Sequence, residues 1–146
     1  TSFFANIKGF KHLKISFKKT LILDDSLKNN IVFGSNPNEI DLNWIEECLN
    51  LVKLKDFYES LDKGLETILG EDGSKISGGQ KQRIGLARAL YSKPEIIVLD
   101  EATNALDNKT ESLILKTVVK LNNKITFIII SHDDKVLKIC NKIFYM

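Results

Sequence analysis

Four apolar residues, Ile96-Ile97-Val98-Leu99, run directly into two acids, Asp100-Glu101. A continuous apolar run of this length is typical of a strand that is buried on both faces of a sheet. A helical pattern over residues 110–121 follows, and then a second apolar run, Ile125–Ile130, which ends in Ser131-His132. A strand, a helix and a strand at this spacing need a right-handed crossover between parallel strands. This stretch therefore predicts an α/β fold with a parallel core sheet and two buried strands.

The residues before this core carry helical patterns, which predict an α-helical insert. Ser26 and Asp41 are expected N-caps, because each precedes an apolar pattern with helical spacing. Cys48 lies on the apolar stripe of the second pattern, which favours a buried thiol over a reactive one. The other expected elements are helices over 26–33, 41–52, 79–91 and 133–139, a glycine-rich loop over 62–79, strand-like pieces at Leu13–Phe17 and Leu21–Leu23, and the start of a strand at Ile143–Tyr145.

Composition and charge exclude several classes of protein. The chain has 146 residues, of which 43% are apolar and 27% charged, as in ordinary globular proteins rather than disordered tails. Its net charge of +2 gives no support to nucleic-acid binding through bulk charge. Two cysteines are too few for a disulfide scaffold, and no apolar run approaches the roughly 20 residues of a membrane helix. Because the chain begins with Thr and ends within an apolar pattern, we expect a piece of a longer, cytosolic protein.

Polar residues follow both predicted core strands, at the edge where parallel sheets bind ligands. In a phosphoryl-transfer site, Asp100 would hold Mg²⁺, and Glu101 would orient or deprotonate the attacking water. His132, after the next strand, would bond a γ-phosphate or that same water. The alternative is that the two acids only end their strand and face solvent, and that His132 is an ordinary loop residue. These residues alone leave both interpretations open.

The segment Ser77-Gly78-Gly79-Gln80 stands at the start of a predicted helix. Adjacent glycines let a ligand approach the backbone closely, and the helix start offers free N–H groups and the positive end of the dipole. Together with the Ser77 hydroxyl and the Gln80 amide, these groups form a candidate phosphate contact. The alternative is a plain turn in which Ser77 is the N-cap.

Four motifs in order resemble the ATP-binding-cassette (ABC) family over residues 12–146. Residues Ile76–Arg83 look like the LSGGQ signature, with isoleucine in place of the usual leucine. Ile96–Glu101 resembles the Walker B strand with its glutamate, Asn104–Asp107 the D-loop with asparagine for serine, and Ser131-His132 the H-loop. Residues 24–31 and 64–71 also resemble exporter-type cassettes, the first being similar to the segment that faces the membrane domain. Agreement of four ordered motifs is highly specific.

The resemblance implies a role for each matching residue. Asp100 would help to hold Mg²⁺, Glu101 would be the general base, and His132 would contact the γ-phosphate. The signature residues would bind the γ-phosphate of ATP held by the opposite subunit of a head-to-tail dimer, and the D-loop residues would cross the dimer interface. The signature residues are Ser77, Gly78, Gly79 and Gln80, and the D-loop residues are Asn104, Ala105, Leu106 and Asp107.

The phosphate-binding loop of the family is missing from the sequence. A Walker A loop reads G-x-x-x-x-G-K-S/T, and its backbone amides and lysine cradle the phosphates. Gly73 and Gly78 have the required separation, but Gly79 and Gln80 follow where a lysine and a hydroxyl residue are needed. Lys18 stands at about the place of the Q-loop glutamine, and an upstream adenine-stacking aromatic is missing as well. We therefore expect the second half of a cassette, which alone binds ATP weakly or not at all.

The resulting expectation is a partial P-loop NTPase (ABC ATPase) fold with an α-helical subdomain. Residues 1–25 would be a remnant of the core with a disturbed Q-loop region, 26–92 the helical subdomain with the signature, and 93–146 the core with Walker B, D-loop and H-loop. The intact protein would be an exporter-type ABC ATPase with ATP and Mg²⁺ as cofactors. Its partners would be a second nucleotide-binding domain and transmembrane domains at the cytoplasmic face of the plasma (inner) membrane, without nucleic acid. A soluble ABC-family ATPase and a degenerate, non-hydrolysing remnant are the alternatives.

Overall fold

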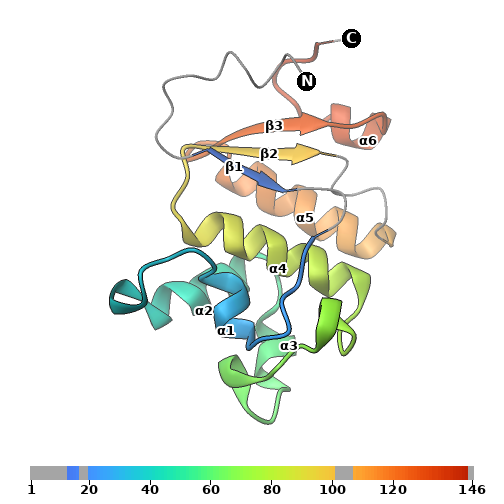
Figure 1. Ribbon diagram of the computed structural model, residues 1–146. Helices are drawn as coiled ribbons and strands as arrows, with labels where there is room; N and C mark the ends of the chain where they lie inside the picture. Colours follow the sequence, from blue (N-terminus) through green and yellow to red (C-terminus); the bar gives the residue numbers. More distant parts are fainter. Residues whose placement is uncertain (1–12, 17–19, 101–106, 145–146) are drawn as a thin grey trace.

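The structure of the chain is a computed structural model that describes residues 13–16, 20–100 and 107–144. It consists of a small sheet, two long helices packed beneath it and a group of short helices below those (Figure 1). The strands are β1 (Leu13–Ser16), β2 (Ile96–Asp100) and β3 (Thr126–Ile130). The helices are α1 (Leu27–Ile31), α2 (Leu42–Leu51), α3 (Lys55–Glu59), α4 (Gly78–Tyr91), α5 (Asn108–Leu121) and α6 (Asp134–Leu137), with short 3₁₀ turns at 37–39, 64–66 and 71–73.

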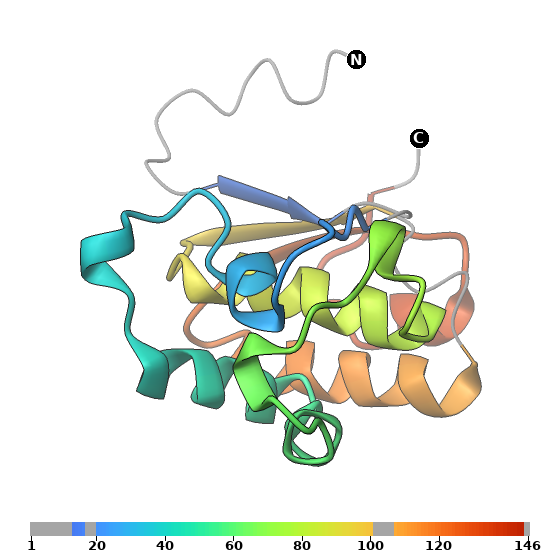
Figure 2. The same ribbon diagram turned by 60° about the horizontal axis from the view of Figure 1, so that its bottom comes forward.

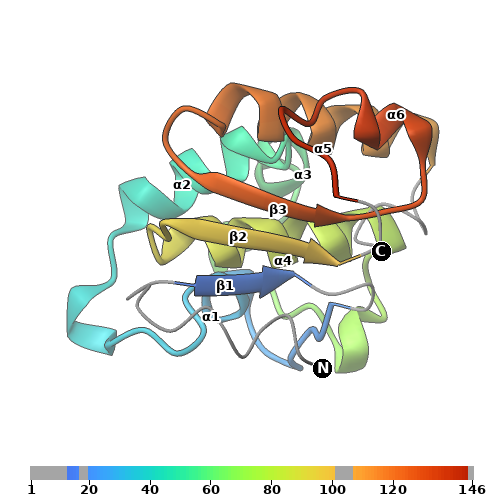
Figure 3. The same cartoon turned by 90° about the horizontal axis from the view of Figure 1, so that it is seen from above.

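The sheet is parallel and has the order β1-β2-β3 (Figure 3). Residues Ile96–Leu99 of β2 are all buried, which confirms the prediction from their continuous apolar run. The prediction of a second fully buried strand was wrong, because β3 is exposed at Thr126 and only half-buried from Phe127 to Ile130. Within the described residues β3 pairs with β2 alone, so one side of it lacks a neighbouring strand.

Helix α4 lies between the sheet and the helical insert, and it is buried on more than one side. It contacts α1 and α2 on one side and β1 on the other. Ile84, Ala87, Leu90 and Tyr91 are all buried, as their spacing predicts. α5 runs alongside α4 beneath the sheet and buries one face, which includes Ile114, Thr117 and Val118 (Figure 2). The core therefore extends from the sheet through α4 into the insert.

Side-chain caps and one buried amide hold the insert together. Ser26 caps α1 by accepting from Asn29 N–H, and Asp41 caps α2 by accepting from Trp44 N–H, as predicted. Asn30 is fully buried; its Nδ2 donates to the carbonyls of Leu23 and Ser26, both at 3.1 Å, and its Oδ1 accepts from Leu23 N–H at 2.9 Å. This amide replaces the hydrogen bonds that segment 21–23 would make as a strand, and that predicted strand does not form.

Other local predictions have clear outcomes. Cys48 is fully buried, and this burial raises the pKa of its thiol to about 12, so the thiol stays protonated and unreactive.

The expected strand at 143–145 does not form at residues 143 and 144, and residue 145 lies outside the described residues. An apolar run becomes a strand only beside another strand, and the described sheet offers these two residues no pairing. In the described part of the chain, no helix is both long enough and apolar enough to cross a membrane.

Candidate functional site

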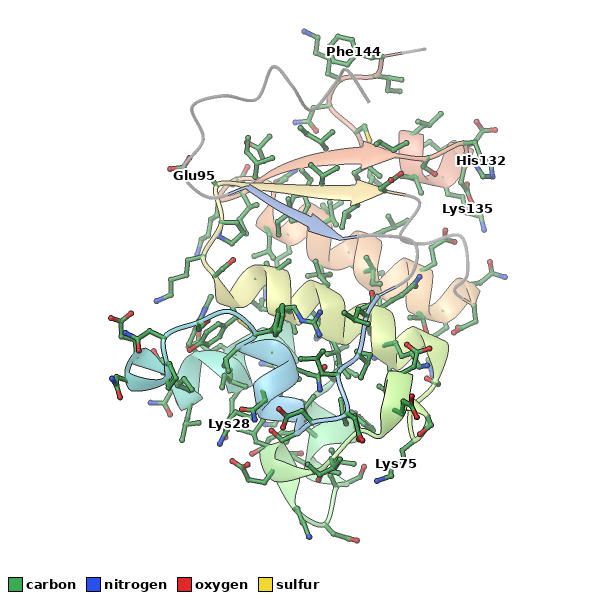
Figure 4. The ribbon with its side chains drawn as sticks, in the orientation of Figure 1. Lys28, Lys75, Glu95, His132, Lys135 and Phe144 are labelled. Carbon is green, nitrogen blue, oxygen red and sulfur yellow. The ribbon has the colours of Figure 1, made fainter. Side chains whose placement is uncertain are left out.

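The carboxyl ends of β2 and β3 lie side by side. Asp100 is the last residue of β2 and pairs in register with Ile130 at the end of β3. Asp100 is half-buried, whereas His132, two residues beyond β3, is exposed at the same end of the sheet (Figure 4). The predicted general base, Glu101, lies outside the described residues. The fold thus brings the segments that carry Asp100 and His132 to one edge, as the order of the strands predicts.

A chain of short-range hydrogen bonds shapes the turn that carries His132. The Ser131 Oγ accepts from Asp133 N–H at 3.0 Å and closes the turn around His132. The Asp133 Oδ1 then accepts from Lys135 N–H at 2.7 Å and caps α6. Val136 is fully buried and fixes the base of α6 against the core. His132 is therefore presented to solvent from a turn whose backbone is held on both sides.

The signature residues form the N-terminus of α4. Ser77 Oγ accepts from Gln80 N–H at 3.2 Å, and Gln80 Oε1 accepts from Ser77 N–H at 2.7 Å, which together make a capping box. The N-cap interpretation is confirmed, since Ser77 caps α4, whereas the phosphate contact stays a prediction. The box engages the N–H groups of Ser77 and Gln80, so those of Gly78 and Gly79 are the ones available to an anion.

Gly78 and Gly79 differ in the space that a Cβ would have at each position. A Cβ at Gly78 would meet no atom within 4 Å, so this position faces open space. A Cβ at Gly79 would meet the Thr110 side chain at 3.3 Å, because the start of α5 packs closely against the start of α4. A side chain at Gly79 would thus be tight against the start of α5, while Gly78 leaves the surface clear for a ligand.

Asp107 caps α5, and its charge also acts on Arg83 of the signature helix. Its Oδ1 accepts from the N–H groups of Lys109 and Thr110, each at 3.0 Å, and its Oδ2 accepts from the Thr110 hydroxyl at 2.7 Å. The Thr110 hydroxyl and amide lower the pKa of Asp107. Burial lowers the pKa of the Arg83 guanidinium on α4, and the charge of Asp107 opposes this shift. Asn104, Ala105 and Leu106 lie outside the described residues.

The described candidate residues lie at one end of the molecule. α4 and α5 begin at the end where β2 and β3 finish, and α6 begins there as well (Figures 1 and 2). Gly79 against Thr110 connects α4 to α5, and a hydrogen bond of 3.4 Å from Lys135 Nζ to Asn108 Oδ1 connects α6 to α5. Sequence reasoning missed Thr110 and Lys135, because no sequence pattern identifies a contact between two helix starts.

The donor set at the strand ends fits a Mg²⁺ ion. Among the described residues, no group of three or more His, Cys, Asp or Glu side chains could hold a metal ion. Mg²⁺ does not need such a group, since it is commonly held by one or two carboxylates with waters and substrate phosphates. Asp100 offers one such carboxylate. A groove of about 510 Å³ between α5 and α6 contains none of the predicted site residues in its lining, so it is not the predicted nucleotide site.

Comparisons with known proteins agree with this architecture. The ABC transporter family model matches residues 9–104. The multidrug resistance protein sirA of Leptosphaeria maculans is 35% identical over 129 residues, which is 88% of this chain and 10% of that protein. The ATP-dependent lipid A-core flippase of Saccharophagus degradans is 39% identical over 122 residues, which is 84% of this chain and 20% of that protein.

A solved structure supports the same relationship. The chain superimposes on a bacterial Atm1-family ABC exporter with ATP bound, with a TM-score of 0.78 and 32% identity, over 86% of this chain and 22% of that one. The chain thus spans between about a tenth and a quarter of the length of the relatives it matches. The chain has a partial P-loop NTPase fold, and both its sequence and its structure match those of ABC exporters. This chain therefore belongs to the ABC transporter family, as part of an exporter-type nucleotide-binding domain.

Proposed function

We propose that these residues supply the hydrolytic half of a transport-coupled ATPase site in the full-length protein. The observation that carries this proposal is the pairing of Asp100 with Ile130, which sets the acid at the end of β2 beside the end of β3, next to the turn that carries His132. Phosphoryl transfer needs positioning and electrostatic stabilisation at one place, and this edge collects groups of both kinds.

Each residue has a distinct proposed role. Asp100 would help to hold Mg²⁺, which supplies charge neutralisation for the phosphates when bound. Glu101 would accept the proton of the attacking water as general base, and His132 would donate a hydrogen bond to the γ-phosphate. Ser77 and Gly78 are exposed at the start of α4, which supports contact with ATP held by a second cassette in a head-to-tail dimer. Residues 104–107 would cross that interface.

The exporter relatives favour membrane transport over a soluble ABC machine. Under this proposal, α1 and α2 pass the movement of the cassette to transmembrane domains. Phe33, which follows α1, and Leu42, which begins α2, are exposed apolar side chains on this part of the molecule and support an interface there. The domain would work at the cytoplasmic face of the plasma (inner) membrane.

Residues 1–146 alone should have little activity. No Walker A loop is present to cradle the phosphates, so most of the nucleotide's binding energy is missing. Isothermal titration calorimetry of the purified chain with Mg²⁺-ATP should detect weak binding or none. Micromolar affinity would contradict this expectation.

The site assignment is tested by Glu101→Gln in the full-length protein. Loss of the base should abolish turnover while ATP still binds, because the amide keeps the shape of the side chain but accepts no proton. Glu95→Gln is the matched control, since Glu95 is exposed at the opposite end of β2 (Figure 4). If turnover survived in the Glu101 variant, the choice of base would be wrong.

A non-hydrolysing remnant is the second candidate. The missing Walker A loop and Lys18 at the Q-loop position favour it. The coding sequence immediately upstream distinguishes the two: a G-x-x-x-x-G-K-S/T loop there supports the ATPase, whereas a start codon directly before Thr1 supports the remnant.

A further inference from the structure

Lys135 reaches from α6 to the start of α5. Its Nζ donates to Asn108 Oδ1 at 3.4 Å and lies 4.0 Å from Glu111 Oε2. Both partners belong to the first turn of α5, which Asp107 caps. Figure 4 shows Lys135 and His132 at the same end of the molecule, the end that carries the candidate site.

The backbone N–H of the same lysine holds the turn that carries His132. It donates to Asp133 Oδ1, while Asp133 N–H donates to Ser131 Oγ. Movement of residue 135 is therefore passed through two hydrogen bonds to the residues on either side of His132. Among residues 131, 133 and 135, Lys135 is the one whose polar contacts, within the described part of the chain, reach both the turn and α5: its N–H donates to Asp133, and its Nζ contacts Asn108 and Glu111.

The contact of Lys135 with α5 is expected to affect the orientation of α6 more than the stability of the fold. The Lys135 side chain is 64% exposed, and ion pairs of exposed side chains contribute little to the stability of a protein. α6 has only four residues, and Val136 is its only buried side chain. So short a helix can rotate about one buried residue, and a second attachment is needed to fix its direction. Glu111 is suited to this, because its side chain on α5 is only 11% exposed.

We infer that Lys135 is a positioning residue for His132: it fixes the turn after β3 against the start of α5, and so sets the direction of the imidazole toward the nucleotide. This inference rests on the proposed function, because His132 is the group through which Lys135 would act. It adds a contact between the H-loop and the helix that follows the D-loop within one chain.

The test replaces Lys135 in the full-length protein. Lys135→Met keeps the length of the side chain but removes its charge, and it should lower kcat on the order of tenfold, because a misplaced catalytic contact has effects of that size or more. KM for ATP should stay within about twofold, since most of the binding energy of ATP comes from the phosphate-binding loop rather than from His132. Lys135→Arg should restore most of kcat. In a His132→Ala background, Lys135→Met should cause no further loss.

A matched control separates this effect from loss of any surface charge. Lys55 and Glu59 form an exposed ion pair of 3.6 Å on α3, away from the candidate site. Lys55→Met should leave kcat and the melting temperature unchanged. Lys135→Met should also leave the melting temperature nearly unchanged. If Lys135 only stabilised the fold, a fall in activity would come with a lower melting temperature.

Amide hydrogen exchange gives a readout that needs no turnover. Exchange at positions 133 and 135 of the full-length protein should accelerate several-fold in Lys135→Met and stay the same in Lys55→Met. Unchanged exchange, or a fall in kcat of equal size with and without His132, overturns the inference. A His132→Ala variant with wild-type kcat also overturns the inference but leaves the proposed ATPase function standing. Absence of turnover in the wild-type protein overturns the proposed function, and the exchange measurement then still tests the contact of Lys135.

Discussion

α4 and α6 both begin with a capped turn at the candidate site, but the two helices are anchored in opposite ways. α4 has 14 residues, and its buried side chains face both the sheet and the insert. α6 has four residues, of which one is buried, and an exposed lysine connects it to α5. Substitutions along α4 should therefore change folding, while those around α6 should change the position of a single side chain. The difference shows that stability and site geometry depend on separate parts of this chain.

The largest effect should come from the buried amide that joins α1 to α4. The Asn30 side chain donates to the carbonyls of Leu23 and Ser26, and its Oδ1 accepts from Arg88 Nη2 on α4 at 3.2 Å. Asn30→Ala would leave several buried backbone groups without partners, so we expect a loss of about 3 kcal/mol in the free energy of unfolding. Chemical denaturation of the purified chain measures this loss.

The control for that variant is the neighbouring asparagine. Asn29 is exposed, and its side chain donates to Asp25 Oδ1 at 2.9 Å. Asn29→Ala should change the free energy of unfolding by no more than about 0.5 kcal/mol. Equal losses at the two positions would mean that the buried hydrogen bonds do not join α1 to α4 in solution.

An intermediate effect is expected at the close approach of α4 to segment 20–26. A Cβ at Gly85 would meet the Thr20 side chain at 2.7 Å, and threonine is too stiff to move aside cheaply. Gly85→Ala should therefore lower stability by a net of about 1 kcal/mol, because overpacking outweighs the gain in helix propensity. Thermal unfolding of the chain measures it, with Gly78→Ala as the control that should be neutral or stabilising.

The smallest effect should come from the exposed cap of α5. Hydrogen bonds from Thr110 lower the pKa of Asp107 below its ordinary value of 3.8. A lowered pKa in the folded state means that the carboxylate stabilises the fold above pH 3.8, and that this contribution is lost as pH falls through the folded pKa. Asp107→Asn should thus lower the melting temperature slightly at neutral pH and progressively less below pH 4.

The matching variant for the cap is Thr110→Val, which removes the hydroxyl that is the largest cause of the shift. It should move the acid transition of the chain to higher pH, in the same direction as loss of the carboxylate. Melting curves of both variants at a series of pH values would show this. A difference from wild type that stayed constant with pH would contradict the role of Asp107.

Helix starts and single strands were predictable where the interactions that determine them join residues close together in the sequence. Ser26, Asp41 and Ser77 each cap the helix that follows, and the side chain and amide of each cap are neighbours in the sequence. The apolar run of β2 likewise predicted a central buried strand. The order of the motifs placed Asp100 and His132 after adjacent strands, which the register of β2 and β3 now describes. Their catalytic roles remain predictions.

The errors concern contacts between distant segments. β3 has an apolar sequence like that of β2, yet only pairing on a second side would bury it, and the described sheet has no strand there. Segment 21–23 gives its hydrogen bonds to Asn30 instead of to a strand, a choice that its own residues do not encode.

The amino-acid sequence by itself determined the family, the caps of α1, α2 and α4 and the buried central strand, since motif order and short-range hydrogen bonding need no knowledge of distant neighbours. Only the tertiary structure decided that Gly79 packs on Thr110, that Lys135 meets the first turn of α5, and that β3 stays half-buried. These features arise when helices and strands far apart in the chain come together, and burial and pairing energies belong to that arrangement rather than to any single segment.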